Sequence, residues 1–343
     1  MAEVETVACP LCSNAQRFID VRVPSRDEHI RGYGALYAGM AKSVWKVCGR
    51  CGFVHQNPRP SIAALNKFYT DGNYHTKIDI APDELFASHA PYYMDEVDYA
   101  IARSGLSKGR VFDVGCGLGV ALKIFADRGW QCFGIEPDPG RFEYAQRHYG
   151  LSDIRQGAID EHFDLGQQVD LVFTHHAFEH FADLPSVMTA ITKLLAPGGY
   201  MFTAIPTYRE NRSSMSKLWM NSAHYSLFSQ RSFAQLLARH GFEEVSSRYN
   251  PWKAGPDQLG HLARFTGASQ APETFYEDPE EVARYLDVVN PIRSAVYLPL
   301  IGGYRGYRHY FSHYAKLARA AGHTLRTEPD QLLAKTAAYF RKK

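Results

Sequence analysis

The chain has 343 residues, of which 45% are hydrophobic and 22% are charged, and its formal net charge at pH 7 is +2. This composition is typical of a globular protein, and the small net charge gives no support of its own to nucleic-acid binding. The length predicts two or three structural units. No apolar run reaches the roughly 18 residues of a membrane-spanning helix. The first residues lack the pattern of a secretory signal, which favours a cytoplasmic protein with no membrane partner.

Two pairs of cysteines flank a strand-like segment near the start of the chain. Cys9 and Cys12 form one C-x-x-C pair, Cys48 and Cys51 form the other, and thirty-five residues separate the pairs. Each pair can form a tight turn with both thiolates directed at one centre, and four thiolates complete the tetrahedral shell of Zn²⁺. Four protein ligands leave no open position. The pattern therefore predicts a structural zinc ribbon over residues 1–60, the alternative being two unrelated reduced pairs.

Two helices are expected between the cysteine-rich segment and the centre of the chain. Ser61 follows the turn-forming "NPRP" and can cap a helix over residues 61–69. Residues 83–104 have the amphipathic pattern of a longer helix. The turn-rich segment 104–109 leads into the next domain. We therefore assign residues 61–104 to a helical linker that also contributes a lid.

From residue 110 onward, short apolar segments alternate with helical patterns. This alternation predicts a parallel sheet with helices on both faces. An irregular insertion at 206–228 precedes a capped helix over 229–242 and a strand over 243–249. We assign residues 105–270 to an α/β core and 271–343 to a C-terminal helical extension. The other expected strands are 110–114, 131–136, 153–156, 169–174 and 199–205, and the helices between them are 118–128, 138–149 and 183–195.

The segment "VFDVGCGLG" at residues 111–119 places three glycines directly after the first of these strands. Gly115, Gly117 and Gly119 permit a sharp turn and let a ligand approach the backbone with no Cβ in the way. Glu136 ends the second strand, where its carboxylate can accept both hydroxyls of a ribose. Together these features predict a site for an adenosine-containing molecule. The G-x-G-x-G spacing differs from the G-x-G-x-x-G of dinucleotide folds, which disfavours a nicotinamide reductase.

Four segments resemble the signature segments of class I S-adenosylmethionine-dependent methyltransferases. They are "VFDVGCGLG", "GIEPD", "VDLVFTHHAFEHFAD" and "LLAPGGYMFTAIP", in an order and spacing that also fit. The resemblance covers roughly residues 105–250 and implies a Rossmann-like α/β core with a seven-stranded, mostly parallel sheet. The last strand of such a sheet is antiparallel, and we expect it near residues 258–266. The implied cofactor is S-adenosylmethionine.

The resemblance also implies which residues contact the cofactor. Asp113 and the glycine loop would hold its methionine part, and Glu136 would take the ribose hydroxyls. Ala158 and Ile159 would contact the adenine, and Asp160 would either reach the adenine amine or simply begin a helix. The implied set is Asp113, Gly115, Cys116, Gly117, Gly119, Glu136, Pro137, Ala158, Ile159, Thr174, His175 and Tyr74.

The segment "THHAFEHF" at residues 174–181 concentrates histidines in the expected methyl-transfer crevice. A hydroxyl or an acidic C–H needs a base to become a nucleophile, and histidine is the common choice. We expect His175 and His176 on the loop after the fourth strand. Glu179 and His180 would follow at the start of the next helix, where they act in proton transfer or brace the loop.

The insertion at 206–228 lies where this fold builds its substrate lid. Its "HYSLFS" segment resembles the family's recurrent histidine-plus-aromatic segment. The aromatic-rich segment 68–75 would close the pocket from the other side, or pack between domains. Candidate contacts in these segments are Tyr69, Tyr74, His75, Tyr208, Arg209 and Arg212. The candidate catalytic residues are His176, His180, His224, Glu179 and Tyr225, with no ranking among the histidines.

A leader with two cysteine pairs and "NPRPS" ahead of such a core resembles methyltransferases of bacterial sugar and natural-product pathways. This implies methylation of an oxygen or carbon of a small substrate, such as a nucleotide-linked sugar. Residues 301–343 hold nine basic and two acidic residues, a composition that suits phosphate contacts, RNA binding or the packing of a homodimer. The alternatives are a zinc-ribbon methyltransferase of RNA or another macromolecule, and a scaffold that binds S-adenosylmethionine.

Overall fold

The computed structural model describes residues 4–21, 44–71, 81–208, 224–251 and 257–288. The chain divides into one compact unit, Met1–Asp287, and a second, Val288–Lys343. Several predicted features lie outside the described residues: Tyr74, His75, Arg209, Arg212 and the basic stretch 301–343. Within the described part of the chain, no helix is both long and apolar enough to cross a membrane.

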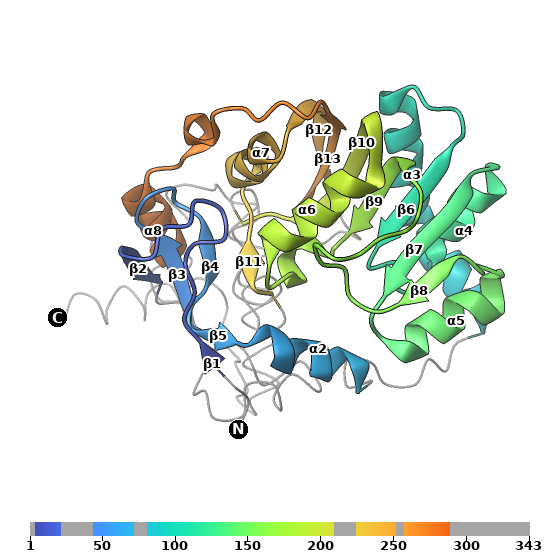
Figure 1. The fold of residues 1–343 in the computed structure, drawn as a ribbon, viewed down its shortest axis with the longest axis horizontal. Helices are drawn as coiled ribbons and strands as arrows, with labels where there is room; N and C mark the ends of the chain where they lie inside the picture. Colours follow the sequence, from blue (N-terminus) through green and yellow to red (C-terminus); the bar gives the residue numbers. More distant parts are fainter. Residues whose placement is uncertain (1–3, 22–43, 72–80, 209–223, 252–256, 289–343) are drawn as a thin grey trace, which may run out of the picture. The chain divides into compact units, whose positions relative to one another are not determined.

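A seven-stranded sheet forms the centre of the first unit (Figure 1). Its strand order is β12-β13-β10-β9-β6-β7-β8, and β13 runs antiparallel to both of its neighbours while the other pairs are parallel. The mostly parallel sheet and the antiparallel strand near 258–266 are therefore confirmed. The strands are β6 Arg110–Val114, β7 Gln131–Glu136, β8 Ile154–Gln156, β9 Val169–His175, β10 Leu195–Pro206, β12 Phe242–Pro251 and β13 Asp257–Phe265.

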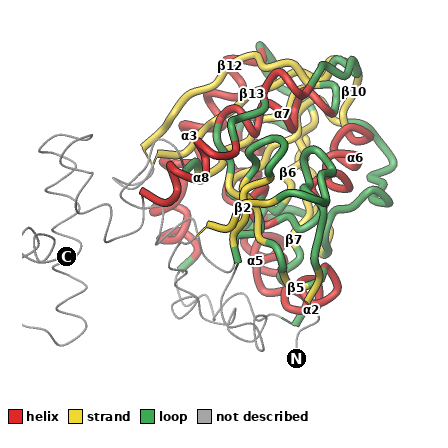
Figure 2. The backbone as a smooth tube through the Cα atoms, turned by 90° about the vertical axis from the view of Figure 1, so that its left-hand side faces the viewer, coloured by secondary structure: helices red, strands yellow, loops and turns green. Residues whose placement is uncertain are grey.

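Helices cover both faces of this sheet (Figure 2). Successive strand residues point to opposite faces: Val111 packs in one apolar cluster with α3, α4 and α5, and Phe112 packs in the other with α6 and α7. Both faces of the sheet are thus buried, as the run of apolar strands predicts. The helices are α3 Pro82–Ser104, α4 Val120–Asp127, α5 Pro139–Tyr149, α6 Leu184–Leu194 and α7 Gln230–Arg239.

The N-terminal segment forms a separate small sheet with the order β11-β4-β3-β2. Its edge strand β11 comes from the insertion that we expected to be irregular, and it pairs antiparallel with β4. The cysteine-bearing sheet therefore contains a piece of the chain that follows β10. Its strands are β2 Phe18–Val21, β3 Trp45–Cys48, β4 Val54–Gln56 and β11 Ser226–Leu227, while β1 Val4–Glu5 pairs with β5 Arg59–Pro60.

Three shorter elements complete the described fold. Helix α2, Ile62–Thr70, begins as predicted after Ser61, whose hydroxyl accepts a hydrogen bond from the Ala64 amide at 3.2 Å. The 3₁₀ helix η4, Pro272–Phe275, and helix α8, Pro279–Val288, follow the sheet. The predicted domain boundaries at residues 60, 104 and 270 stay predictions.

The segment after β9 differs from its predicted form. Glu179 and His180 lie in a separate 3₁₀ turn, η2 Phe178–His180, instead of opening the next helix. Helix α6 starts later because Asp183 caps it, accepting a hydrogen bond from the Ser186 amide at 3.1 Å, and Pro185 suits its first turn. His175 is the last residue of β9 and not part of the loop.

Candidate active site

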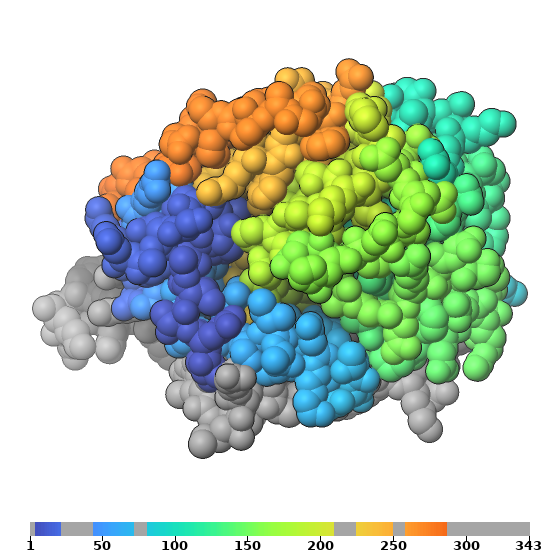
Figure 3. All heavy atoms as spheres, viewed as in Figure 1, coloured from blue at the N-terminus to red at the C-terminus, as the bar shows by residue number. Residues whose placement is uncertain are grey.

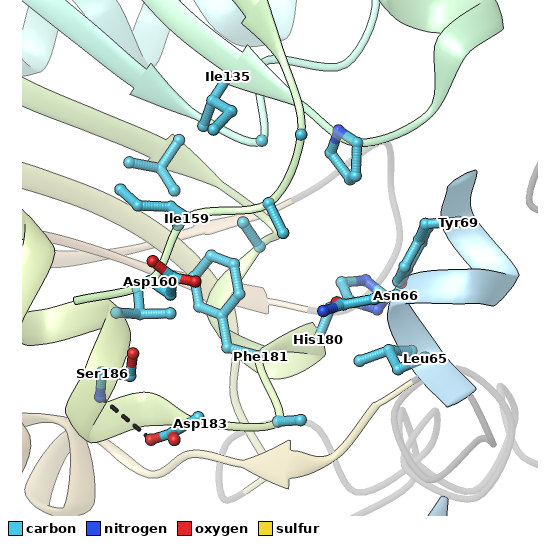
Figure 4. A pocket seen from close by; sticks show the side chains of 18 of the residues that line it. Leu65, Asn66, Tyr69, Ile135, Ile159, Asp160, His180, Phe181, Asp183 and Ser186 are labelled. Carbon is cyan, nitrogen blue, oxygen red and sulfur yellow. Dashed lines mark hydrogen bonds between the residues drawn. The ribbon is translucent and has the colours of Figure 1, made fainter. Parts of the chain in front are cut away.

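A cavity of about 400 Å³ opens at the carboxyl ends of the parallel strands. The ends of β6 and β7, the segment 157–162 and the segment from His176 to the first turn of α6 line one part of it. Helix α2 lines the other part with Leu65, Asn66 and Tyr69, which Figure 4 shows opposite Ile159. This edge of the sheet is where open α/β folds bind their ligands.

The glycine turn leaves open space for a ligand. Gly115, Gly117 and Gly119 have φ angles of +74°, +56° and +78°, which only glycine adopts without strain. An added Cβ would come no closer than 3.4 Å to other atoms at Gly115 and 3.5 Å at Gly117. At Gly119 it would overlap Leu151 at 2.7 Å. The first two glycines therefore keep the turn open, and the third permits close packing of α4.

Glu136 is held rigidly at the wall of the cavity. Its Oε2 accepts a hydrogen bond from the Gly117 amide at 2.8 Å, and its Oε1 accepts one from the Asp138 amide at 2.9 Å. Burial raises the pKa of Glu136, while Arg141 and the two amides oppose that rise. Burial, and then the nearby Glu136, also raise the pKa of Asp113. Of these two carboxyl groups Glu136 lines the cavity, where its oxygens can accept hydrogen bonds from hydroxyl groups of a ligand.

The segment 158–161 lines the cavity with two apolar residues followed by two acidic ones. Ala158 and Ile159 line the cavity together with Asp160. The Asp160 carboxylate accepts a hydrogen bond from the His162 amide at 2.9 Å, and the segment forms a turn. The alternative that Asp160 begins a helix is therefore wrong. Figure 4 shows Ile159 and Asp160 directed into the cavity.

Three titratable side chains meet beside the cavity: Glu179, His180 and His224. Their ligand-type atoms all lie within 4.8 Å of one another, and the rings of His180 and His224 pack edge to face at 4.7 Å. Glu179 is 1% exposed, and within the described part of the chain its carboxylate oxygens have no hydrogen-bond donor. Burial raises the pKa of Glu179 to about 8. The cluster can therefore hold a proton near neutral pH, and His180 brings it to the cavity wall.

His176 belongs to a buried chain of polar groups. Its Nε2 lies 2.6 Å from Oε1 of Gln258, whose amide nitrogen donates to the carboxylate of Glu96. In this arrangement the proton of His176 sits on Nε2, so Nδ1 carries the lone pair. Nδ1 lies 3.9 Å from Oε1 of Glu179. Burial lowers the pKa of His176 to about 4, so its ring is neutral at pH 7.

Several other predicted residues are not among those that line the cavity. Thr174 is fully buried, and the His175 ring packs against Tyr93 at 4.6 Å. Cys116 is 7% exposed and belongs to the apolar cluster under α4. Tyr225 is 1% exposed and lies under the Arg59 guanidinium. The predicted residues that do line the cavity are Tyr69, Gly115, Glu136, Pro137, Ala158, Ile159, Asp160, His176 and His180.

Residues 86–247 match the family model described as a methyltransferase domain. The match covers the glycine turn, Glu136 and the histidine cluster around η2, and the sheet has the predicted topology. The chain carries a class I methyltransferase domain.

Curated relatives of the methyltransferase domain include O- and C-methyltransferases. The ubiquinone biosynthesis O-methyltransferase of Azorhizobium caulinodans is 31% identical over 99 residues, which are 28% of this chain and 39% of that protein. The C-methyltransferase NovU of Streptomyces niveus is 27% identical over 184 residues, 48% of this chain and 43% of that protein. The chain thus spans less than half the length of either relative. A solved structure, magnesium protoporphyrin IX methyltransferase of Synechocystis with bound S-adenosylhomocysteine (SAH), is 14% identical and has a TM-score of 0.44. The alignment covers 59% of this chain and 98% of that chain.

Sequence reasoning missed four polar residues around the methyltransferase site. Asn66 and Arg141 line the cavity, and Glu96 and Gln258 orient His176. Glu96 and Gln258 come from α3 and β13, far apart along the chain, so no local motif could have connected them. Asn66 could have been found, because it shares a helical face with Tyr69, three residues on.

The four cysteines of the leader come together at one point. The Cys9 and Cys51 sulfurs are 3.6 Å apart, the Cys12 and Cys48 sulfurs are 3.5 Å apart, and all four lie within 4.8 Å of one another. All four are buried and none forms a disulfide. A tetrahedral zinc with Zn–S bonds of about 2.3 Å places its sulfurs about 3.8 Å apart. The cluster therefore fits a four-thiolate zinc site.

Proposed function

We propose that this chain is an S-adenosylmethionine-dependent methyltransferase that methylates an oxygen or carbon of a small biosynthetic substrate. The glycine turn carries the proposal, because it leaves open space next to a buried carboxylate at the carboxyl edge of the sheet. The O- and C-methyltransferases among the relatives support the choice of acceptor atom.

The cavity residues fit the cofactor. Gly115 lines the cavity and, with the open turn at Gly117, would leave room for the methionine part of the cofactor near Asp113. Glu136 would accept its ribose hydroxyls. The apolar wall at Ile159 would contact its adenine. When bound, S-adenosylmethionine supplies an electrophilic methyl group on a sulfonium. Burial raises the pKa of both carboxyl groups, and the positive charge of the bound cofactor would oppose that rise at Glu136, as Arg141 already does.

For the acceptor, we propose that His180 and His224 provide the base. His180 lines the cavity, its ring contacts His224, and Glu179 lies beside both. His176 lines the cavity too, but its lone-pair nitrogen faces Glu179, so we assign it the role of holding the Glu179 carboxyl group in place. A base removes the proton of a hydroxyl or an acidic C–H while the acceptor is held in line at about 3–3.5 Å.

We further propose that the substrate is a sugar derivative or natural-product intermediate and that the leader holds a structural Zn²⁺. The cysteine geometry supports the zinc, since four buried sulfurs converge on one point. A phosphorylated or nucleotide-linked substrate is supported by the basic composition of residues 301–343. We also propose that the protein forms a homodimer and is located in the cytoplasm.

Methyl-labelled S-adenosylmethionine tests this function directly. The protein would be incubated with the labelled cofactor and an extract of the organism that makes it, and the mixture passed through a size-cutoff filter. Label in the small-molecule filtrate, absent with the Glu136→Ala variant, would support the proposal and provide the product for identification. Label retained with macromolecules would instead favour RNA, protein or polysaccharide methylation, and nuclease or protease digestion would separate these cases.

A further inference from the structure

We propose that Gln56 is a positioning residue through which the cysteine-bearing sheet holds His224 in the catalytic cluster. The proposal rests on the proposed function, because it assigns Gln56 a role in presenting a base. In this view the leader does more than stabilise the N-terminus. It sets the place of His224, whose ring contacts the cavity-lining His180.

The contacts of Gln56 carry this inference. Gln56 is fully buried at the end of β4, and its side-chain amide donates to the His224 carbonyl at 2.6 Å. Its backbone amide donates to the Tyr225 carbonyl at 2.9 Å. The antiparallel pairing of β4 with β11 continues over Ser226 and Leu227. Four consecutive residues that begin with the candidate base are therefore fixed to β4.

The same segment is fixed from its other side to η2. The Tyr225 amide donates to the Glu179 carbonyl at 2.7 Å, which joins the two halves of the cluster. Arg59 of β5 donates to the Ala182 carbonyl and lies over the Tyr225 ring at 5.6 Å. Glu5 holds this arginine through a 2.9 Å ion pair. Glu5, Gln56 and Arg59 thus connect the leader to both segments that supply the proposed base. Figure 3 shows the blue N-terminal atoms packed against yellow-green atoms of the core.

The cysteine cluster determines where β4 lies. Cys48 ends β3, and its amide donates to the Phe53 carbonyl at 2.8 Å, closing the turn that contains Cys51. Strand β4 starts at the next residue and pairs with β3 up to Gln56, opposite Trp45. A metal held at this turn would therefore fix the register of β4 and, through Gln56, the backbone of His224.

The test uses the full-length, zinc-loaded protein and the variant Gln56→Met. Methionine keeps the length and volume of glutamine but has no N–H to donate to His224. We expect zinc content and SAH affinity to match the wild type, while the amides of residues 225–228 exchange with deuterium about tenfold faster. The ring signals of His224 in ¹⁵N-histidine NMR should also shift, which a contribution to overall stability alone would not cause.

Asp20→Asn provides the matched control. Asp20 lies on β2, the edge of the same sheet opposite β11, and its side chain is 76% exposed. In this variant the backbone amides of residues 225–228 should exchange with deuterium at the wild-type rate. Should Gln56→Met fail to fold, Gln56→Asn keeps a buried amide that is one methylene too short to reach His224, and it should give the same local increase.

Unchanged exchange at 225–228 together with unchanged His224 ring signals would overturn the role of Gln56. The proposed function fails by a different result, namely a wild-type protein that does not bind SAH. The exchange comparison does not depend on cofactor or substrate, so the two failures are distinguishable.

Discussion

The carboxyl group of Glu179 is buried at a site where the described residues offer its oxygens no hydrogen-bond donor. It lies next to two histidines, and burial raises its pKa from an ordinary 4.5 to about 8. Between these two pH values the unfolded chain has lost the proton that the folded protein keeps. Stability contributed by this group is therefore present below about pH 4.5 and is lost as the pH rises to about 8.

Replacing Glu179 by glutamine should remove this pH dependence. We expect the free energy of unfolding of Glu179→Gln to exceed that of the wild type, by a margin that grows by about 2 kcal/mol from pH 6 to pH 8.5. Urea unfolding of the zinc-loaded proteins at several pH values measures the margin. The control is Glu143→Gln, an exposed glutamate of α5, whose margin should not change with pH. A margin independent of pH for Glu179→Gln would contradict the raised pKa.

Variants of His180 and His224 test base catalysis separately from cofactor binding. His180→Asn and His224→Asn should each lower the methyl-transfer rate by about 100-fold or more, the range lost with a general base. SAH affinity should stay within about twofold, because neither ring belongs to the glycine turn or the adenine wall. The methyl-transfer rate is measured with labelled cofactor and the small-molecule fraction of the extract, and SAH affinity is measured by calorimetry. His148→Asn, an exposed histidine of α5, is the control. Wild-type rates in both variants would contradict base catalysis by these histidines, and catalysis would then come from the positioning of the reactants alone.

Among the elements, the turn between β6 and α4 depends on a glycine for two separate reasons. Gly119 has a φ of +78°, and an added Cβ would lie 2.7 Å from Leu151 and 2.9 Å from Ala145. Gly150, which caps α5, has a φ of +65° but open space around it. Alanine at either position meets the left-handed penalty of about 1–2 kcal/mol, and at Gly119 it also overlaps the core.

Gly119→Ala should therefore destabilise the fold more than Gly150→Ala. We expect a loss of about 1 kcal/mol for Gly150→Ala and at least about 3 kcal/mol for Gly119→Ala, since overpacking a core adds roughly 1–3 kcal/mol. Denaturant unfolding of both variants provides the comparison. Equal losses would show that conformation alone, and not the contact with α5, requires glycine at 119.

The elements also show how far the sequence could predict the site. The strands of the core, the glycine turn and each C-x-x-C pair follow from local patterns, because each depends on residues close together in the chain. The cluster of all four cysteines follows from the known preference of Zn²⁺ for four thiolates. The 3₁₀ turn that carries Glu179, and strand β11, were not predictable in this way. Both are set by contacts between distant segments, such as the hydrogen bond from Tyr225 to Glu179 and the pairing of β11 with β4. The same holds for the Glu96–Gln258–His176 chain.

At the scale of the whole molecule, the proposed zinc site and the proposed cofactor site are formed by different residues. We expect one zinc per chain by elemental analysis, and removal of the metal, or Cys48→Ser, should lower the melting temperature. SAH affinity should change by no more than a few-fold, because the glycine turn and Glu136 belong to the core sheet. A metal-free wild type with an unchanged melting temperature would contradict the structural role of the four cysteines.

The assignment of the cavity as the S-adenosylmethionine site is the central claim, and SAH calorimetry tests it most directly. The wild type should bind one SAH per chain and no NADH. Glu136→Ala should weaken SAH binding by about 100-fold, since two hydrogen bonds to a charged acceptor are lost, while Glu143→Ala should leave it unchanged. Thermal unfolding of Glu136→Ala, checked alongside, should show a folded protein. Wild-type SAH affinity in Glu136→Ala, or binding of NADH in place of SAH, would contradict the account.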